Sequence, residues 1–138
     1  MSSVTQRNIT ALRWILAAGI VSTAIHYSHN FVMVEHYPGP HGVMYTLTRV
    51  GIIVLWPLLT AKGLVGYRRY AAGRVREARP RLIAYSALGI STLGHFLYGN
   101  PHVPILFYTT IFTDAITGFA ALGFALWATS PSIQRTRP

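Results

Sequence analysis

Four long apolar segments dominate this chain and restrict the folds that are open to it. They lie near residues 11–34, 44–67, 82–99 and 104–129. A helix needs about 20 apolar residues to cross the roughly 30 Å of hydrocarbon in a bilayer, and each segment comes close to that length. The pattern predicts an all-α, polytopic integral membrane protein with four transmembrane helices.

Composition and loop length refine this prediction. Of the 138 residues, 51% are hydrophobic and only 11% are charged, which is too apolar for a typical water-soluble domain. We expect a single four-helix transmembrane domain over residues 1–138. Short connections make neighbouring helices antiparallel, so the predicted architecture is an up-down-up-down bundle. Cysteine is absent, which excludes disulfides and chemistry that depends on thiolates.

The net charge of +9 is concentrated in a few places. The loops near residues 35–43 and 100–103 contain no Lys or Arg, and this asymmetry predicts that both termini and the central loop face the cytoplasm. The bias toward Arg over Lys favours a bacterial cell membrane. We read the central loop as a topology signal, with contact to anionic lipid as the alternative, and we expect no nucleic-acid binding because no soluble basic face with readout residues is evident. The basic residues are Arg68, Arg69, Arg74, Arg76, Arg79 and Arg81 in the central loop, and Arg7, Arg13, Arg135 and Arg137 toward the termini.

Four ionisable residues interrupt the apolar segments: His26, Arg49, His95 and Asp114. A charge at the centre of a membrane helix costs roughly 2.5 to 3.5 kcal/mol on insertion scales, so such residues usually mark a site or a buried pair. Each lies toward the predicted outer end of its segment. Helical spacing places His26 and His29 on one polar face of the first helix. We therefore expect one cavity, open to the outside, into which these side chains converge.

The leading functional hypothesis is a metal or haem site. The residues His26, His29, His95 and Asp114 supply imidazole and carboxylate ligands for zinc or copper, with the carboxylate alternatively orienting a ligating histidine. Haem needs only one histidine of the first helix and His95 across the bundle, with Tyr98 nearby.

A second hypothesis needs no cofactor. A carboxyl group and an imidazole in an apolar pocket suit general acid–base chemistry on a lipid, sterol or isoprenoid, as in an isomerase, cyclase or hydrolase. Asp114 would be the acid or base and His26 its partner, while Arg49 and Tyr98 would orient a polar head. The structural alternative is a buried ion pair between Arg49 and Asp114.

A third hypothesis is a non-catalytic accessory subunit of a larger membrane complex, or a homo-oligomer. Transport ranks below these three, because only Pro57 interrupts a helix near its middle. Small residues allow membrane helices to approach closely. The glycines that would serve this packing are Gly51, Gly63, Gly89, Gly94, Gly118 and Gly123.

Overall fold

The computed structural model describes residues 3–37 and 42–128, and the regular secondary structure in these ranges is helical. Four α-helices account for most of it, and two short 3-10 segments follow the first and third of them. The helices are α1 (Ser3–Val32), η1 (Val34–His36), α2 (Val43–Ala71), α3 (Val75–Ser91), η2 (Thr92–Leu97) and α4 (Ile105–Ala128).

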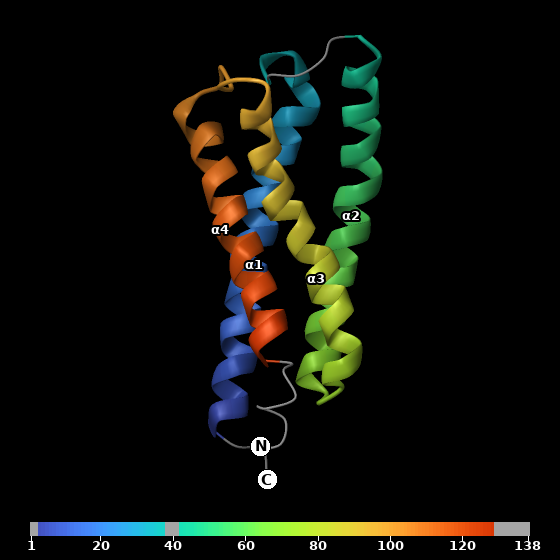
Figure 1. Ribbon diagram of the computed structural model, residues 1–138, viewed down its shortest axis with the longest axis vertical. Coiled ribbons are helices and arrows are strands. Elements are labelled where there is room, and N and C mark those ends of the chain that lie inside the picture. The colour runs from blue at the N-terminus through green and yellow to red at the C-terminus, as the bar shows by residue number, and fades with distance from the viewer. Residues whose placement is uncertain (1–2, 38–41, 129–138) are drawn as a thin grey trace.

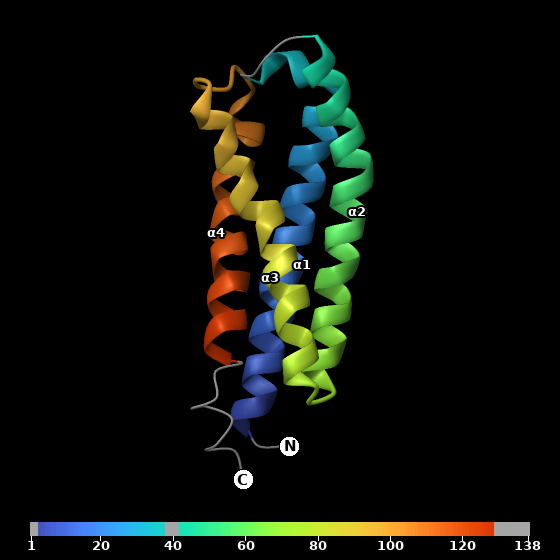
Figure 2. The ribbon, with the colours of Figure 1, turned by 45° about the vertical axis from the view of Figure 1, so that its right-hand side comes forward.

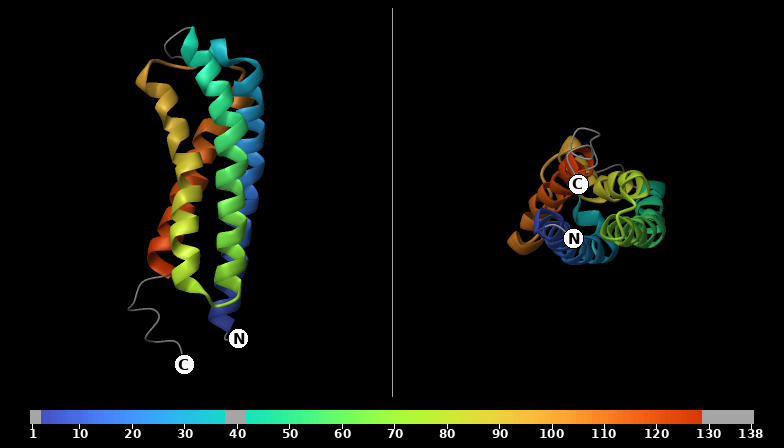
Figure 3. Two further views of the ribbon diagram at one scale, coloured as in Figure 1. Left: turned by 90° about the vertical axis from the view of Figure 1, so that its right-hand side faces the viewer. Right: turned by 90° about the horizontal axis from the view of Figure 1, so that it is seen from below.

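The four α-helices run alternately up and down and form one elongated bundle (Figure 1). α1 packs against α2 and α4, and α3 packs against the same two helices, so the four close a ring that is seen end-on in Figure 3. The start of α1, the α2–α3 turn and the end of α4 lie at one end, while η1, η2 and the start of α4 lie at the other (Figure 2). The predicted up-down-up-down bundle is confirmed.

Three helices are long and apolar enough to cross a bilayer: Thr5–Val32, Met44–Ala71 and Ile105–Ala128. α2 turns many apolar side chains, including Leu47 and Ile53, toward the outside, as a helix facing lipid tails does. Among the described helices α3 is not one of these three, because it has only 17 residues and its first two turns are rich in charge. The protein is therefore an integral membrane bundle in which α3 packs against both α2 and α4.

The connection between α2 and α3 is much shorter than predicted. α2 continues to Ala71 and α3 begins at Val75, and Gly73 closes the turn with a φ of 76° that favours glycine. The prediction of a loop over residues 68–81 was wrong. Arginine is a good helix former, and its long stem lets the guanidinium group reach water from a helix, so both helices continue past the apolar segments.

Helix ends also differ from the sequence prediction elsewhere. α1 begins at Ser3 rather than near residue 11, and the third helix changes to 3-10 geometry at Thr92 rather than running to residue 99. Pro57 lies within α2 as predicted, and Pro80 lies in the second turn of α3. Membrane helices tolerate internal proline because neighbouring groups satisfy the freed carbonyl.

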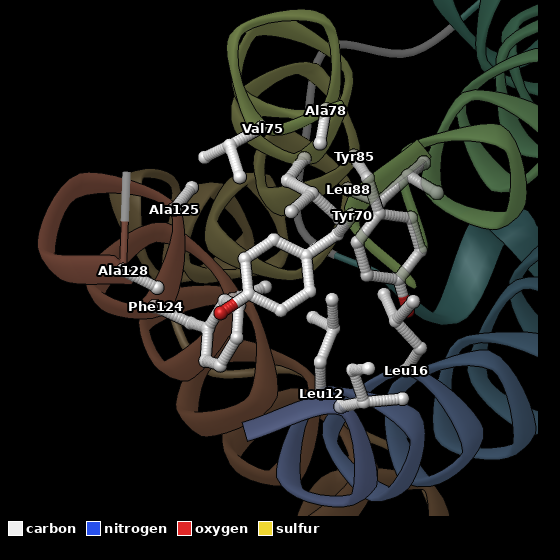
Figure 4. Close-up of a cluster of buried hydrophobic side chains, with 13 residues drawn as sticks. Leu12, Leu16, Tyr70, Val75, Ala78, Tyr85, Leu88, Phe124, Ala125 and Ala128 are labelled. Atoms are coloured by element: carbon white, nitrogen blue, oxygen red, sulfur yellow. The ribbon is translucent and has the colours of Figure 1, made fainter. Parts of the chain in front are cut away.

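The interior near the start of the chain is packed with apolar side chains from all four helices (Figure 4). Leu12 from α1 lies beside the ring of Tyr70 from α2, and Phe124 of α4 meets that ring edge-on with centroids 5.1 Å apart. Within a bilayer such contacts stabilise the bundle through van der Waals packing, because lipid tails are as apolar as leucine. The hydrophobic core therefore lies in the half of the bundle that contains the start of α1 and the end of α4. The buried polar residues lie in the opposite half.

Glycines allow the closest helix approaches. A Cβ atom added to Gly89 of α3 would clash with the backbone carbonyl of Asp114, and one added to Gly118 of α4 would meet the backbone of α3. Gly63 similarly makes room for the ring of Tyr85. The packing role predicted for these three glycines is confirmed. A Cβ atom added to Gly51, Gly94 or Gly123 would meet nothing within 4 Å in the described part of the chain, so the predicted role of these glycines, which included packing against a partner, stays a prediction.

Candidate functional site

His26 and Asp114 form a buried pair in the half of the bundle away from the hydrophobic core. His26 lies near the end of α1 and Asp114 in the middle of α4, and neither side chain has any exposed surface. His26 Nδ1 is 2.9 Å from Asp114 Oδ2, although the approach is too oblique for a straight hydrogen bond. The predicted convergence of these two residues is therefore observed, and it makes them each other's partner.

His95 extends this pair on the other side of the imidazole. Its Nε2 atom lies 3.1 Å from Nε2 of His26 and 3.3 Å from the amide nitrogen of Asn30. His95 belongs to η2, whose start is tied down by Thr92, which donates hydrogen bonds to the carbonyls of Gly89 and Ile111. Asp114, His26 and His95 thus form a continuous chain of contacts between three helical elements.

The hydrogen-bond partners determine where the protons lie. In the amide orientation of this structure the nitrogen of Asn30 faces His95 Nε2 and can only donate, so this orientation places the proton of a neutral His95 ring on Nδ1. His26 must then donate from Nε2. His26 Nδ1 and Asp114 Oδ2 lie close enough to share one further proton, which would make the cluster neutral. A neutral cluster is what burial in hydrocarbon favours.

Several buried acceptors in the cluster have no hydrogen-bond donor among the described residues. They are both carboxylate oxygens of Asp114 and the side-chain oxygen of Asn30. Unsatisfied buried polar atoms are rare because each costs roughly 1 to 3 kcal/mol. The cluster is therefore able to accept an additional donor, which can be a proton, a water molecule or a polar group of a ligand.

Tyr37, which follows η1, covers the site and was not anticipated from the sequence. Its ring stacks on His26 with centroids 5.7 Å apart and lies 4.7 Å from the ring of His95. Its hydroxyl is hydrogen-bonded to Nδ1 of His29 at 2.9 Å. Burial, together with the nearby Asp114 carboxylate, raises the pKa of Tyr37 to about 12, so the phenol stays protonated. Helical spacing could not reveal this residue, because it lies outside the regular helices.

The remaining predicted site residues lie around the cluster rather than in it. Arg49 donates a hydrogen bond to the carbonyl of Phe31 and pairs with Glu35 at 3.5 Å, so the alternative of an Arg49–Asp114 ion pair was wrong. Both of its partners lie at the end of α1 or just beyond it, nearer to Arg49 than the buried carboxylate. The carboxylate of Asp114 has a histidine as its neighbour instead.

His29 and Tyr98 are likewise outside the chain of contacts. The ring of His29 stacks on Phe107 at a centroid distance of 3.7 Å, and Tyr98 is largely exposed after η2. Among the residues that the structure describes, no three His, Asp or Glu side chains are arranged to hold a metal ion. The structure therefore brings together His26, His95 and Asp114, and leaves His29 on the rim.

Two apolar grooves have Tyr27 and Trp56 in common in their linings. One, of about 400 Å³, lies between α1 and α2, and the other, of about 330 Å³, lies between α1, α2 and α3. The ring of Tyr27 is 5.2 Å from that of His26, and its hydroxyl donates to the carbonyl of Leu88 beside Ser91. His26, His95 and Asp114 do not line either groove, and Tyr27 is the lining residue whose ring lies against His26.

Comparison with known proteins adds no further assignment. No family model matches this chain, and neither the curated proteins nor the solved structures contain a significant match. The chemistry of the cluster itself therefore carries the functional assignment.

Proposed function

We propose that the protein is a membrane enzyme that transfers protons to and from an apolar molecule by general acid–base catalysis. The observation that supports this is the chain of contacts from Asp114 through both ring nitrogens of His26 to His95. A carboxyl group beside an imidazole orients the ring and stabilises its protonated form. In proteins without bound substrate such contacts are often poorly aligned and tighten on binding, which fits the oblique approach of Asp114.

His95 is the residue that would meet the substrate, since it is only partly buried while the other two are sealed. It would donate its Nδ1 proton to the substrate and take the Nε2 proton of His26. His26 would in turn take the shared proton, leaving Asp114 as a carboxylate. Removal of a proton elsewhere on the substrate reverses each step, so an isomerisation restores the cluster with no net change in protons or electrons.

The surroundings support an apolar substrate. Both grooves beside Tyr27 are lined almost wholly by apolar side chains, and their volumes fall within the usual range for ligand pockets. They open sideways between helices that face lipid, so a molecule dissolved in the bilayer reaches them without crossing water. Lipids, sterols and isoprenoids fit this description.

The proposal is tested by measuring whether the protein exchanges hydrogen atoms bound to carbon for deuterium from the solvent. Because the substrate is not identified, a mixture of lipids is used, and any substrate in it would be labelled. Purified protein in nanodiscs is incubated in D2O with an extract of phospholipids, sterols and isoprenoids, and deuterium incorporated at carbon is measured by mass spectrometry. We expect incorporation with the wild type and a loss of at least about 100-fold with Asp114→Asn, since acid–base groups contribute 10² to 10⁴ in rate.

Ser22→Ala provides a matched control. Ser22 joins α1 to α4 through a 2.6 Å hydrogen bond with Thr113 but takes no part in the chain of contacts. This variant should exchange deuterium at close to the wild-type rate. Absence of carbon-bound deuterium with the wild type, or equal exchange with Asp114→Asn, would reject acid–base catalysis.

Metal binding is the second candidate, and one feature favours it. The Nε2 atoms of His26 and His95 face each other, and Asp114 lies behind His26 as a carboxylate does behind many metal-ligating histidines. Stoichiometric zinc or copper, or a Soret band for haem, that is lost in His95→Ala would establish this alternative. Partner subunits and homo-oligomers stay predictions.

A further inference from the structure

The two ends of the bundle differ sharply in charge. The end that carries the cluster has Glu35 and Arg49, which pair with each other and cancel. The opposite end, here called the basic end, has a single acidic residue, Glu77, among the described residues. Its basic residues are Arg7, Arg13, Lys62, Arg68, Arg69, Arg74, Arg76, Arg79 and Arg81.

Glu77 organises the α2–α3 turn, and Figures 1 and 2 show where this turn lies in the bundle. Its carboxylate accepts two hydrogen bonds from Arg74, at 2.6 and 2.7 Å, and pairs with Arg69 at 3.4 Å. Its backbone carbonyl accepts from Arg81. A two-pronged Arg–carboxylate contact is geometrically specific, so the short turn is held in one conformation.

Among the described residues, the Glu77 carboxylate pairs with Arg69 and Arg74 only. Arg68, Arg76 and Arg79 are exposed and have no ion pair in the described part of the chain. Arg76 lies in the first turn of α3, where the positive end of the helix dipole repels a cation, and Arg79 follows in the second turn. This arrangement costs stability in the isolated protein. An anion bound over the turn would offset both the mutual repulsion of the arginines and their repulsion by the dipole.

Aromatic side chains mark the level of the bilayer surface at the same end. Trp14 is 64% exposed and Trp127, next to the last residue of α4, is 54% exposed. The guanidinium of Arg13 lies 5.7 Å from the ring centre of Trp14. Tryptophan gathers where hydrocarbon meets headgroups, and basic side chains reach outward from that level.

We propose that the basic end is a binding surface for anionic phospholipid headgroups, with Arg68, Arg76 and Arg79 as its principal contacts. Charge complementarity identifies the ligand: a dense array of guanidinium groups stands at bilayer-surface level over a turn that Glu77 holds in place. Because anionic lipid is concentrated in the cytoplasmic leaflet, this surface faces the cytoplasm. The end that carries the polar cluster then faces the other side of the membrane.

Lipid binding to the purified full chain tests this proposal. Binding of phosphatidylglycerol and of zwitterionic phosphatidylcholine is measured by native mass spectrometry from detergent. We expect tighter binding of phosphatidylglycerol, which weakens in high salt. Each arginine near the surface contributes roughly fivefold to the affinity for anionic lipid. The triple variant Arg68→Gln/Arg76→Gln/Arg79→Gln should therefore bind phosphatidylglycerol on the order of 100-fold more weakly than the wild type.

Two controls separate charge from folding. Replacing the same three arginines by lysine keeps the charge and should retain most of the affinity, and Arg49→Gln at the other end should leave it unchanged. Equal binding of both lipids by the wild type, or wild-type affinity in the triple glutamine variant, overturns the proposal. Loss of affinity in the lysine variant as well would also overturn it, because charge would not then be the determinant.

Discussion

His26 Nδ1 lies 2.9 Å from Asp114 Oδ2, and both residues are completely enclosed by the bundle. A pair of this kind is expensive to place in hydrocarbon and adds little to stability compared with well-packed apolar residues. Its presence in the interior therefore indicates a functional reason for it. Substitutions can separate what the pair does for stability from what it does chemically.

Replacing one member of the pair should be far more harmful than replacing both. Asp114→Leu leaves Nδ1 of His26 without a partner and should destabilise the protein by about 1 to 3 kcal/mol. The double variant His26→Leu/Asp114→Leu removes the buried polar groups together and should regain most of that loss. Thermal unfolding in detergent, analysed as a double-mutant cycle, checks this coupling. Additive losses would contradict a direct pairing.

The tautomer of His95 follows from its contacts. Because Nε2 accepts from the amide of Asn30, the ring proton should be on Nδ1. The nitrogen-15 chemical shifts of labelled protein distinguish the two tautomers, with His95→Gln used for assignment. A proton found on Nε2 would mean that the amide of Asn30 is turned and that its oxygen is the acceptor.

Glycine packing gives a matched pair of substitutions. Gly89→Ala places a methyl group against the backbone of Asp114 and should cost about 1 to 3 kcal/mol, with loss of any activity of the cluster. Gly123→Ala makes the same change where the space is open, so it should be neutral or slightly stabilising. Unfolding midpoints of the two variants in one detergent provide the comparison.

The phenol of Tyr37 should make the protein sensitive to alkaline conditions. Its pKa is raised by burial from about 10 to about 12, so the unfolded chain loses this proton before the folded protein does. The corresponding stability is complete below pH 10 and is lost as the pH rises through 12. Tyr37→Phe lacks this contribution, and its unfolding midpoint should fall less steeply between pH 10 and 12. Parallel curves for the two proteins would argue against a buried phenol.

The polar stripes of the sequence anticipated part of the cluster. Helical periodicity placed His26 and Asp114 on inward faces, because residues three and four apart share one side of a helix. It also favoured His29, yet that ring is turned toward Phe107 and Tyr37. Spacing specifies a face of a helix but not the partner on another helix, so the membership of the cluster depends on how the helices pack.

Sequence alone determined the membrane location, the four helices and their alternating directions, because hydrocarbon thickness and short connections leave few other choices. Only the tertiary structure decided that Asp114 pairs with His26 rather than Arg49, and that Tyr37 covers them. These contacts join segments up to 88 residues apart, His26 to Asp114. They depend on the rotation of each helix about its axis and on the close approach at Gly89 and Gly118, which local periodicity does not specify.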